Sequence, residues 1–368
     1  MADWLMRFSK KEAFPGIERR RRGDQFASHA RKLFDLTNIS VETIQSCILL
    51  GTICYADAQP KSETLYYSVA IRLALILDIP RRQCTDEIER QVNLRNEETF
   101  LSLHNGAKIT ASPHGRGVWA EMAVLSQIWA QIHELNKQSV GENMDSNALN
   151  HTVDDLARQL YRWAAALPST LQETAENLQR YTALGLGNAF AALHLGYHYY
   201  FEVLFYRFLA KSAGSDPANP SIRGYRRQCE EHALAFCDLL YRSRATDQCQ
   251  CLYGMVGHML VVTSTIYIHI LLFSDQEEQV SLARQRLALN FKILTDLQSF
   301  WVTLDVALSR LQVFHNACNR SIDESFRMDQ WMLTFILEHG SSVTERTFPG
   351  SPSLPGTLQG WYAQEFTS

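Results

Sequence analysis

Apolar residues recur along this chain at spacings of three and four, the period that places them on one face of an α-helix. Leu65, Val69, Leu73 and Ile76 form one such stripe, which ends before Pro80. Two further stripes consist of Met122, Leu125, Trp129 and Ile132, and of Val153, Leu156, Leu160 and Trp163. We predict amphipathic helices whose apolar faces pack into a core. The third should begin at the capping residues 152–155 and stop at 167–169.

Further helices are predicted over 188–211, 222–242, 252–273, 276–298, 301–319 and 325–338. No proline occurs between Ser221 and Phe348, and proline interrupts helices. Sustained alternation with Asn-Gly or Asp-Gly turns, the mark of hairpins, is absent. We therefore predict an all-α fold with one large multi-helix domain over 24–347. A basic segment, 1–23, precedes it, a proline-containing extended tail, 348–368, follows it, and its loops are 105–117, 136–150 and 214–221.

The most apolar run, 259–273, predicts a buried core helix. It is shorter than the roughly 20 residues that span a bilayer, and Thr263, Ser264, Thr265 and His269 interrupt it. The first residues do not form a signal peptide, and the eight cysteines fall mostly in apolar helical stretches. We expect a nuclear or cytoplasmic protein that is not secreted and does not enter a membrane.

Charge argues against direct nucleic-acid binding. Lys and Arg number 35 against 39 Asp and Glu, which gives a net charge of -4, so the chain has no overall positive field. The run 19–22 is four arginines, with Lys10 and Lys11 upstream. Such a run suits a nuclear import receptor or a phosphate, although a solvated helix-flanking face is the commoner role.

One helix carries the candidate chemistry. His194 and His198 lie one turn apart, and Glu202 continues the same face, so the three side chains offer ligands or an acid–base group. Packing is the commoner role in a helix so rich in aromatic residues. The alternative is a pocket for a hydrophobic small molecule, lined by Trp129, His194, Tyr197, His198, Phe201 and Glu202.

Motifs for metals and cofactors are incomplete, so we expect neither. Cys249-Gln250-Cys251 has no second cysteine or histidine pair at zinc-site spacing. Gly185-Leu186-Gly187 lacks the third glycine and the preceding strand of a dinucleotide loop, and we interpret it as a helix start. Phosphate-binding loops and serine nucleophile elbows are also missing.

Several segments, in order, resemble the regulatory middle homology domain of fungal zinc-cluster transcription factors. They are 41–50, the Ala-x-Arg-x-Ala helix at 70–79, Glu89-Arg90, 163–168 with its Leu-Pro ending, 193–197 and Arg207. This resemblance covers roughly 24–319. It implies an all-helical regulatory domain that binds a ligand or a partner.

Three departures from the family pattern bear on function. The DNA-binding cysteine cluster is absent, because no cysteine occurs before Cys47, and the Arg-Arg-x-x-Trp-Trp helix after Glu89-Arg90 is missing. Asp78 stands where glycine is usual. Loss of a helix from a packed domain leaves a cavity or a rearranged wall.

Three functions follow from these observations. The first is a regulator without its own DNA-binding module, tied to a fungal secondary-metabolite pathway and acting on a protein or a hydrophobic small molecule. The second is a repurposed, cofactor-independent cyclase that folds a terpenoid or polyketide in the helical domain, for example for an intramolecular Diels–Alder reaction, since orientation alone accelerates such chemistry. The third is an interaction scaffold without a ligand.

Overall fold

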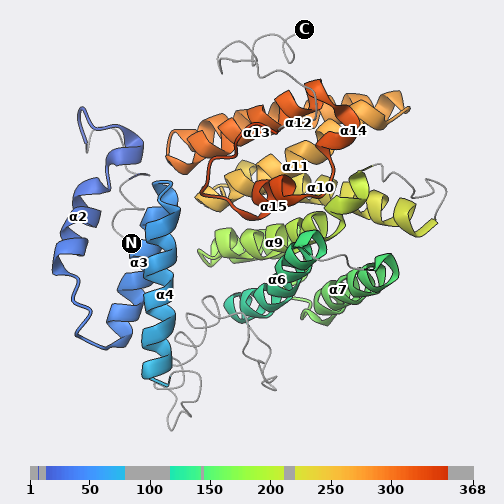
Figure 1. Ribbon diagram of the computed structural model, residues 1–368. Helices are drawn as coiled ribbons and strands as arrows, with labels where there is room; N and C mark the ends of the chain where they lie inside the picture. The colour runs from blue at the N-terminus through green and yellow to red at the C-terminus, as the bar shows by residue number, and fades with distance from the viewer. Residues whose placement is uncertain (1–6, 8–13, 79–116, 142–144, 211–219, 347–368) are drawn as a thin grey trace. The chain divides into compact units, whose positions relative to one another are not determined.

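The computed structural model describes residues 7, 14–78, 117–141, 145–210 and 220–346, and every regular element in these ranges is helical (Figure 1). The all-α prediction is confirmed. Glu89-Arg90, the segment after it, the loops at 105–116 and 214–219 and the tail 348–368 lie outside the described residues.

The chain divides into two compact units, Met1–Gln127 with Asp296–Asp305, and Ile128–Thr295 with Val306–Ser368. The first contains η2 (Arg19–Arg21), α2 (Asp24–Leu33), α3 (Val41–Ala56) and α4 (Pro60–Ile76). We call it the N-terminal unit. The predicted domain boundaries at 23/24 and 347/348 stay predictions.

Helices α3 and α4 form the core of the N-terminal unit. Ile44 and Cys47 of α3 are buried against Ala70, Leu73 and Ala74 of α4. The two helices approach closely because Gly51 has no side chain: a Cβ there would lie 2.7 Å from the Tyr67 ring. Small residues therefore set the helix spacing.

The predicted stripe on α4 is wrong at both ends. Leu65 and Ile76 are 62% and 53% exposed, whereas Leu73 is buried. The buried face instead combines Leu73 with Ala70 and Ala74, because alanine allows the close approach to α3 that larger side chains would prevent.

A distant segment, 296–305, completes the N-terminal unit. Trp301 is fully buried there, and the Arg7 guanidinium lies 5.1 Å from the centre of its ring. Arg7 also donates to Asp57 Oδ1 at 2.9 Å, and Arg20 pairs with Asp305 at 2.9 Å. Buried aromatic area and these charge contacts hold the segment in place.

The second unit consists of α7 (Ser146–Ala166), α8 (Ala175–Ala183), α9 (Gly187–Phe205), η4 (Tyr206–Leu209), α10 (Pro220–Ala245), α11 (Gly254–Phe273), α14 (Ile322–Ser325) and α15 (Gln330–Leu337), with most of α6 (Val118–Gly141), α12 (Glu277–Gln298) and α13 (Thr303–Arg320). Helix α9 packs against α7, α8, α10 and α11, and Figure 1 shows α9 within this unit. Almost its whole surface is buried, so it is the central helix of this unit.

Helix boundaries differ from prediction at two places. Most of the predicted loop 136–150 is helical, because α6 runs to Gly141 and Asp145 caps α7 by accepting from the Ala148 amide at 3.2 Å. Thr152 is an interior residue that donates to the Ala148 carbonyl at 2.9 Å, so the predicted cap at 152–155 is wrong.

The predicted helix 325–338 is divided, and α15 begins after the capping residue Asp329.

Helix α11 is long and apolar enough to cross a membrane, the one such helix in the described part of the chain. Of its most apolar window, 67% lies buried within the structure. This burial agrees with the predicted core helix at 259–273.

Candidate functional site

Five of the six predicted site residues lie on α9, and the sixth, Trp129, lies on α6. Trp129, on α6, stacks on Tyr200 with ring centres 4.8 Å apart and lies 5.8 Å from Tyr199. Tyr200 is two residues beyond His198, about 200° around the helix. Trp129 therefore packs on a different side of α9 from His198.

His198 lies between a carboxylate and a second imidazole. Its Nε2 is 2.8 Å from Glu173 Oε2, and its Nδ1 is 2.9 Å from Nδ1 of His232 on α10. A carboxylate only accepts, so His198 Nε2–H donates to Glu173, and one of the two facing Nδ1 atoms carries the shared hydrogen. Glu173, His198 and His232, which we call the histidine relay, are thus joined by two consecutive hydrogen bonds.

Burial and charge set the protonation states in the histidine relay. Burial, with a smaller contribution from the charge of His198, lowers the pKa of His232 to about 3, so His232 is neutral near pH 7. Burial pushes the pKa of Glu173 upward, but the His198 hydrogen bond and charge outweigh it and bring the net pKa below its usual value. Glu173 is therefore ionised near pH 7, which favours a hydrogen on the His198 Nε2 atom that faces it.

Phe201 and Tyr197 cover the histidine relay with aromatic surface. The Phe201 ring stacks on His232 at 3.9 Å with an interplanar angle of 6°, and Tyr197 meets Phe201 edge-on at 5.2 Å. Tyr197 also lies 5.4 Å from Trp163 of α7. The relay reaches solvent at its ends, since the Glu173 side chain is 26% exposed and His232 is half-buried.

His194 has a structural partner. Its Nε2 is 2.9 Å from the Leu171 carbonyl, whereas its Nδ1 is 3.9 Å from Glu173 Oε2, which is too long for a hydrogen bond. Burial lowers the pKa of His194, so the neutral ring donates to Leu171 and fixes the segment that carries Glu173.

Glu202 lies apart from the histidines, facing α11. Its Oε2 is 2.7 Å from Thr263 Oγ1, and its Oε1 has no hydrogen-bond partner in the described part of the chain. Complete burial raises its pKa well above the usual value, so Glu202 is a neutral acid. Among the described residues, no group of three potential metal ligands is assembled.

Sequence reasoning missed Glu173 and His232. They come from the segment before α8 and from α10, and lie 25 and 34 residues from His198 in sequence. Their own segments carry no recognisable motif, so the helix packing that joins them to His198 is the only signal.

The glycine pair is a helix start, as predicted. Gly185 has φ of 72°, and Gly187 is the first residue of α9. A Cβ on Gly187 would lie 2.4 Å from Thr182 Oγ1 and 3.1 Å from the Cβ of Cys249, so the turn requires glycine. Cys249 and Cys251 are free, buried thiols.

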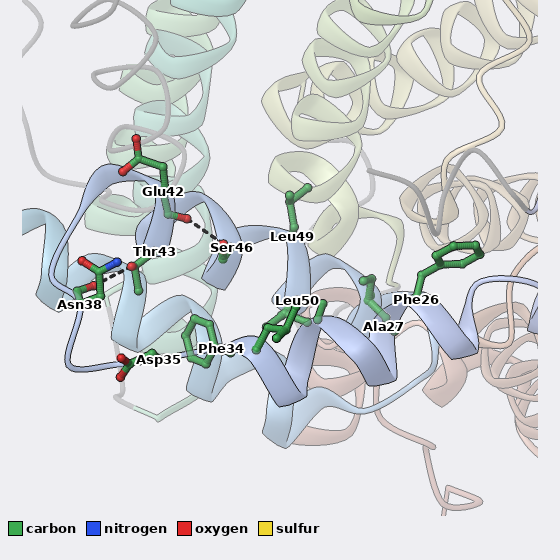
Figure 2. A pocket seen from close by; sticks show the side chains of 13 residues that line it. Phe26, Ala27, Phe34, Asp35, Asn38, Glu42, Thr43, Ser46, Leu49 and Leu50 are labelled. Carbon is green, nitrogen blue, oxygen red and sulfur yellow. Dashed lines mark hydrogen bonds between the residues drawn. The ribbon is translucent and has the colours of Figure 1, made fainter.

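An open apolar groove of about 390 Å³ lies between α2 and α3 (Figure 2). We call it the α2–α3 groove. Its apolar lining includes Phe26, Leu33, Phe34, Leu49, Leu50 and Ile53. Phe26, Leu33 and Leu49 are 37%, 71% and 42% exposed. Exposed apolar side chains concentrated in one concave surface are typical of a binding site.

Polar residues line the α2–α3 groove where α2 connects to α3, among them Asp35, Asn38, Glu42 and Thr43 (Figure 2). Hydrogen bonds from the Thr37 hydroxyl and amide lower the pKa of Asp35. The Glu42 backbone amide and Ser40 lower the pKa of Glu42. The groove therefore combines apolar walls with two ionised carboxylates, and none of the six predicted site residues lines it.

No known family model matches the chain, and neither a curated protein nor a solved structure matches it.

Proposed function

We propose that this chain is a regulatory protein of the fungal transcription-factor type, which controls a secondary-metabolite pathway by binding a protein partner in the α2–α3 groove. The observation that carries this proposal is the groove itself. It presents Phe26, Leu33 and Leu49 to solvent beside two carboxylates.

The residues that line the groove indicate which kind of partner it binds. Two neighbouring helices with apolar residues between them accept a third amphipathic helix, which inserts side chains at i, i+3, i+4 and i+7. Asp35 and Glu42 stay ionised at neutral pH, and no lysine or arginine lines the groove within the described residues. We therefore expect a partner helix with lysine or arginine at one end of its apolar face.

Deleting the gene and measuring transcripts beside metabolites tests the regulator. We expect the transcripts of the pathway genes to fall together with the final product. Unchanged transcripts with an accumulated, uncyclised precursor would contradict regulation.

A pair of matched variants tests the groove. Leu49→Asp places a charge among its apolar side chains, and Leu75→Asp places the same charge on α4, outside the groove; the two leucines are 42% and 44% exposed. Leu49→Asp should fail to restore the transcripts of the deletion strain, whereas Leu75→Asp should restore them. Equal rescue by both variants would rule out this groove.

The histidine relay favours a second candidate, a cofactor-independent cyclase acting on a hydrophobic terpenoid or polyketide. With the shared hydrogen on His198 Nδ1, His232 Nε2–H can donate to a substrate carbonyl and stabilise charge that develops during an intramolecular cycloaddition. The aromatic side chains of Tyr197 and Phe201 would orient the substrate. Packing alone does not explain the relay, because it joins a carboxylate and two imidazoles by hydrogen bonds.

Purified protein and an uncyclised polyene precursor test the cyclase. We expect a faster reaction with altered stereochemistry, reduced about 10- to 100-fold in His198→Gln, which removes the relay but keeps a polar side chain. A rate and product distribution identical to the reaction without protein would exclude this function.

A further inference from the structure

A second pocket, of about 480 Å³, lies between α10, α11 and α12 of the second unit. We call it the α10–α12 pocket. Leu234, Tyr267, Ile270, Leu282 and Ala283 supply its apolar surface. Its volume falls within the roughly 300–1,000 Å³ of small-molecule sites.

Glu230 is the polar group that distinguishes this pocket. Its side chain is 28% exposed, and no group in the described ranges donates a hydrogen bond to its carboxylate. The nearest ring atom, His269 Nδ1, is 3.9 Å from Glu230 Oε1, and His269 Nε2 is 3.0 Å from the Leu209 carbonyl. At 3.9 Å the contact between His269 and Glu230 is too long for a hydrogen bond.

The surrounding charges leave Glu230 without a bonded cation. Arg227 donates to Glu231 Oε1 at 2.7 Å, which pairs these two charges at the rim. Arg226 influences Glu230 through its charge, but its Nε lies 3.4 Å from the Phe208 carbonyl. Partial burial raises the pKa of Glu230, as expected for a carboxylate that has lost water without gaining a hydrogen-bond donor.

The remaining polar group of the floor is already satisfied. The Tyr267 hydroxyl donates to the Ala233 carbonyl at 3.1 Å, so the ring presents only its apolar surface to the pocket. The pocket thus places the Glu230 carboxylate beside a hydrophobic floor, with Arg227, Glu231 and Gln279 as its other polar lining residues.

We propose that the α10–α12 pocket binds a small apolar molecule carrying one primary ammonium group, whose N–H donors pair with the Glu230 carboxylate. The ammonium group forms charge-assisted hydrogen bonds with the carboxylate in place of the water that burial removes. The apolar body of the ligand covers Leu234, Ile270 and Leu282. This site lies in a different unit from the α2–α3 groove, so its test is independent of the proposed regulatory function.

Tryptamine and tryptophol form a matched pair of probes, because both carry an indole and differ in an ammonium against a hydroxyl. Isothermal titration of the full chain should show saturable binding of tryptamine at least about tenfold tighter than tryptophol. Glu230→Gln should reduce tryptamine affinity to that of tryptophol. Glu278→Gln, a matched change at the start of α12 and outside the pocket, should leave it unchanged.

Leu282→Trp tests the position of the ligand, because Leu282 is 38% exposed and a larger side chain there fills the pocket without entering the core. It should abolish tryptamine binding in a protein whose circular dichroism is unchanged. Binding that survives Leu282→Trp, equal affinity in Glu230→Gln, or no saturable binding at millimolar tryptamine would overturn the proposal.

Discussion

Glu202 is a fully buried carboxylic acid on the central helix. Thr263 Oγ1 lies 3.0 Å from the Met259 carbonyl, so the single hydroxyl hydrogen can serve that bond while the protonated Glu202 donates to the Thr263 oxygen. A neutral Glu202 thus allows both Thr263 contacts to form with one hydroxyl hydrogen. Its role is therefore structural at neutral pH.

Glu202→Gln should make the protein more stable than the wild type at about pH 8, by about 1 kcal/mol or more. The folded-state pKa of Glu202 is raised, so the unfolded chain loses this proton first, and wild-type stability falls as pH rises above the unfolded value of about 4.3. Glutamine keeps the donor to Thr263 and cannot ionise. Urea denaturation between about pH 4 and pH 8 measures the difference, which should vanish at the acidic end.

Glu173 gives the opposite pH dependence. Its folded-state pKa is lowered, so its contribution is present above about pH 4.3 and is lost as pH falls through the folded value. Glu173→Gln should cost about 1 kcal/mol at neutral pH, and this cost should shrink as pH falls below about 4.3. Glu176→Gln, an exposed acid three residues away, is the control, and an equal pH profile in both variants would show that the histidine relay does not stabilise the fold.

At the residue scale, the sequence identified His194, His198 and Glu202 but not the residues that they contact. The spacing of His194, His198 and Glu202 placed them correctly on one helix. It could not show that Glu202 faces Thr263 while His198 faces Glu173, because these partners depend on which helices surround α9. The interpretation of the six residues as one ligand pocket stays a prediction.

Among the elements, α8 positions the carboxylate of the relay. Its N-cap Thr174 directly follows Glu173 and accepts from the Asn177 amide at 3.1 Å. Asn177 in turn donates to the Ser169 and Gln172 carbonyls, both at 2.8 Å. The cap and the preceding loop thus hold Glu173 beside His198.

Thr174→Ala should destabilise the protein by about 1 kcal/mol, because it leaves a first-turn amide without an acceptor. Thr174→Ser keeps the acceptor and should stay within a few tenths of the wild type. Thermal denaturation followed by circular dichroism measures both. Equal losses would mean that the threonine methyl group, not the cap, stabilises α8.

Helix positions were predictable where apolar periodicity was strong, as on α7, where Val153, Leu156, Leu160 and Trp163 are all buried. The polar stretch 136–150 was mistaken for a loop because charge and polarity on an exposed face resemble a loop composition. Asp78 has φ of 52°, in the left-handed region that favours glycine and that Asp tolerates. The resembled family has glycine at this position.

At the scale of the whole molecule, the N-terminal unit depends on a segment almost 300 residues away. Trp301 and Phe300 belong to Asp296–Asp305, and Arg7 and Arg19 lie against their rings at 5.1 and 4.7 Å. Neither composition nor periodicity predicts such a contact, because it depends on the path of the chain through the fold.

Trp301→Ala should destabilise the N-terminal unit by about 3–5 kcal/mol, because it removes a fully buried aromatic side chain. Hydrogen exchange should show lost protection in α3 and α4 with α9 and α11 unchanged. Trp331→Ala, beside Phe335 in the second unit, is the reciprocal control. Equal loss of protection in both units would show that they unfold together.

Complementation of a deletion strain with two single variants tests the proposed regulation most directly. Leu49→Asp alters the α2–α3 groove, and His198→Gln alters the histidine relay. With both proteins present at wild-type levels, a regulator that uses the groove predicts lost pathway transcripts with Leu49→Asp and normal transcripts and product with His198→Gln. Normal transcripts in both strains, with uncyclised precursor accumulating in the His198→Gln strain, would contradict the regulator and establish the relay as the functional site.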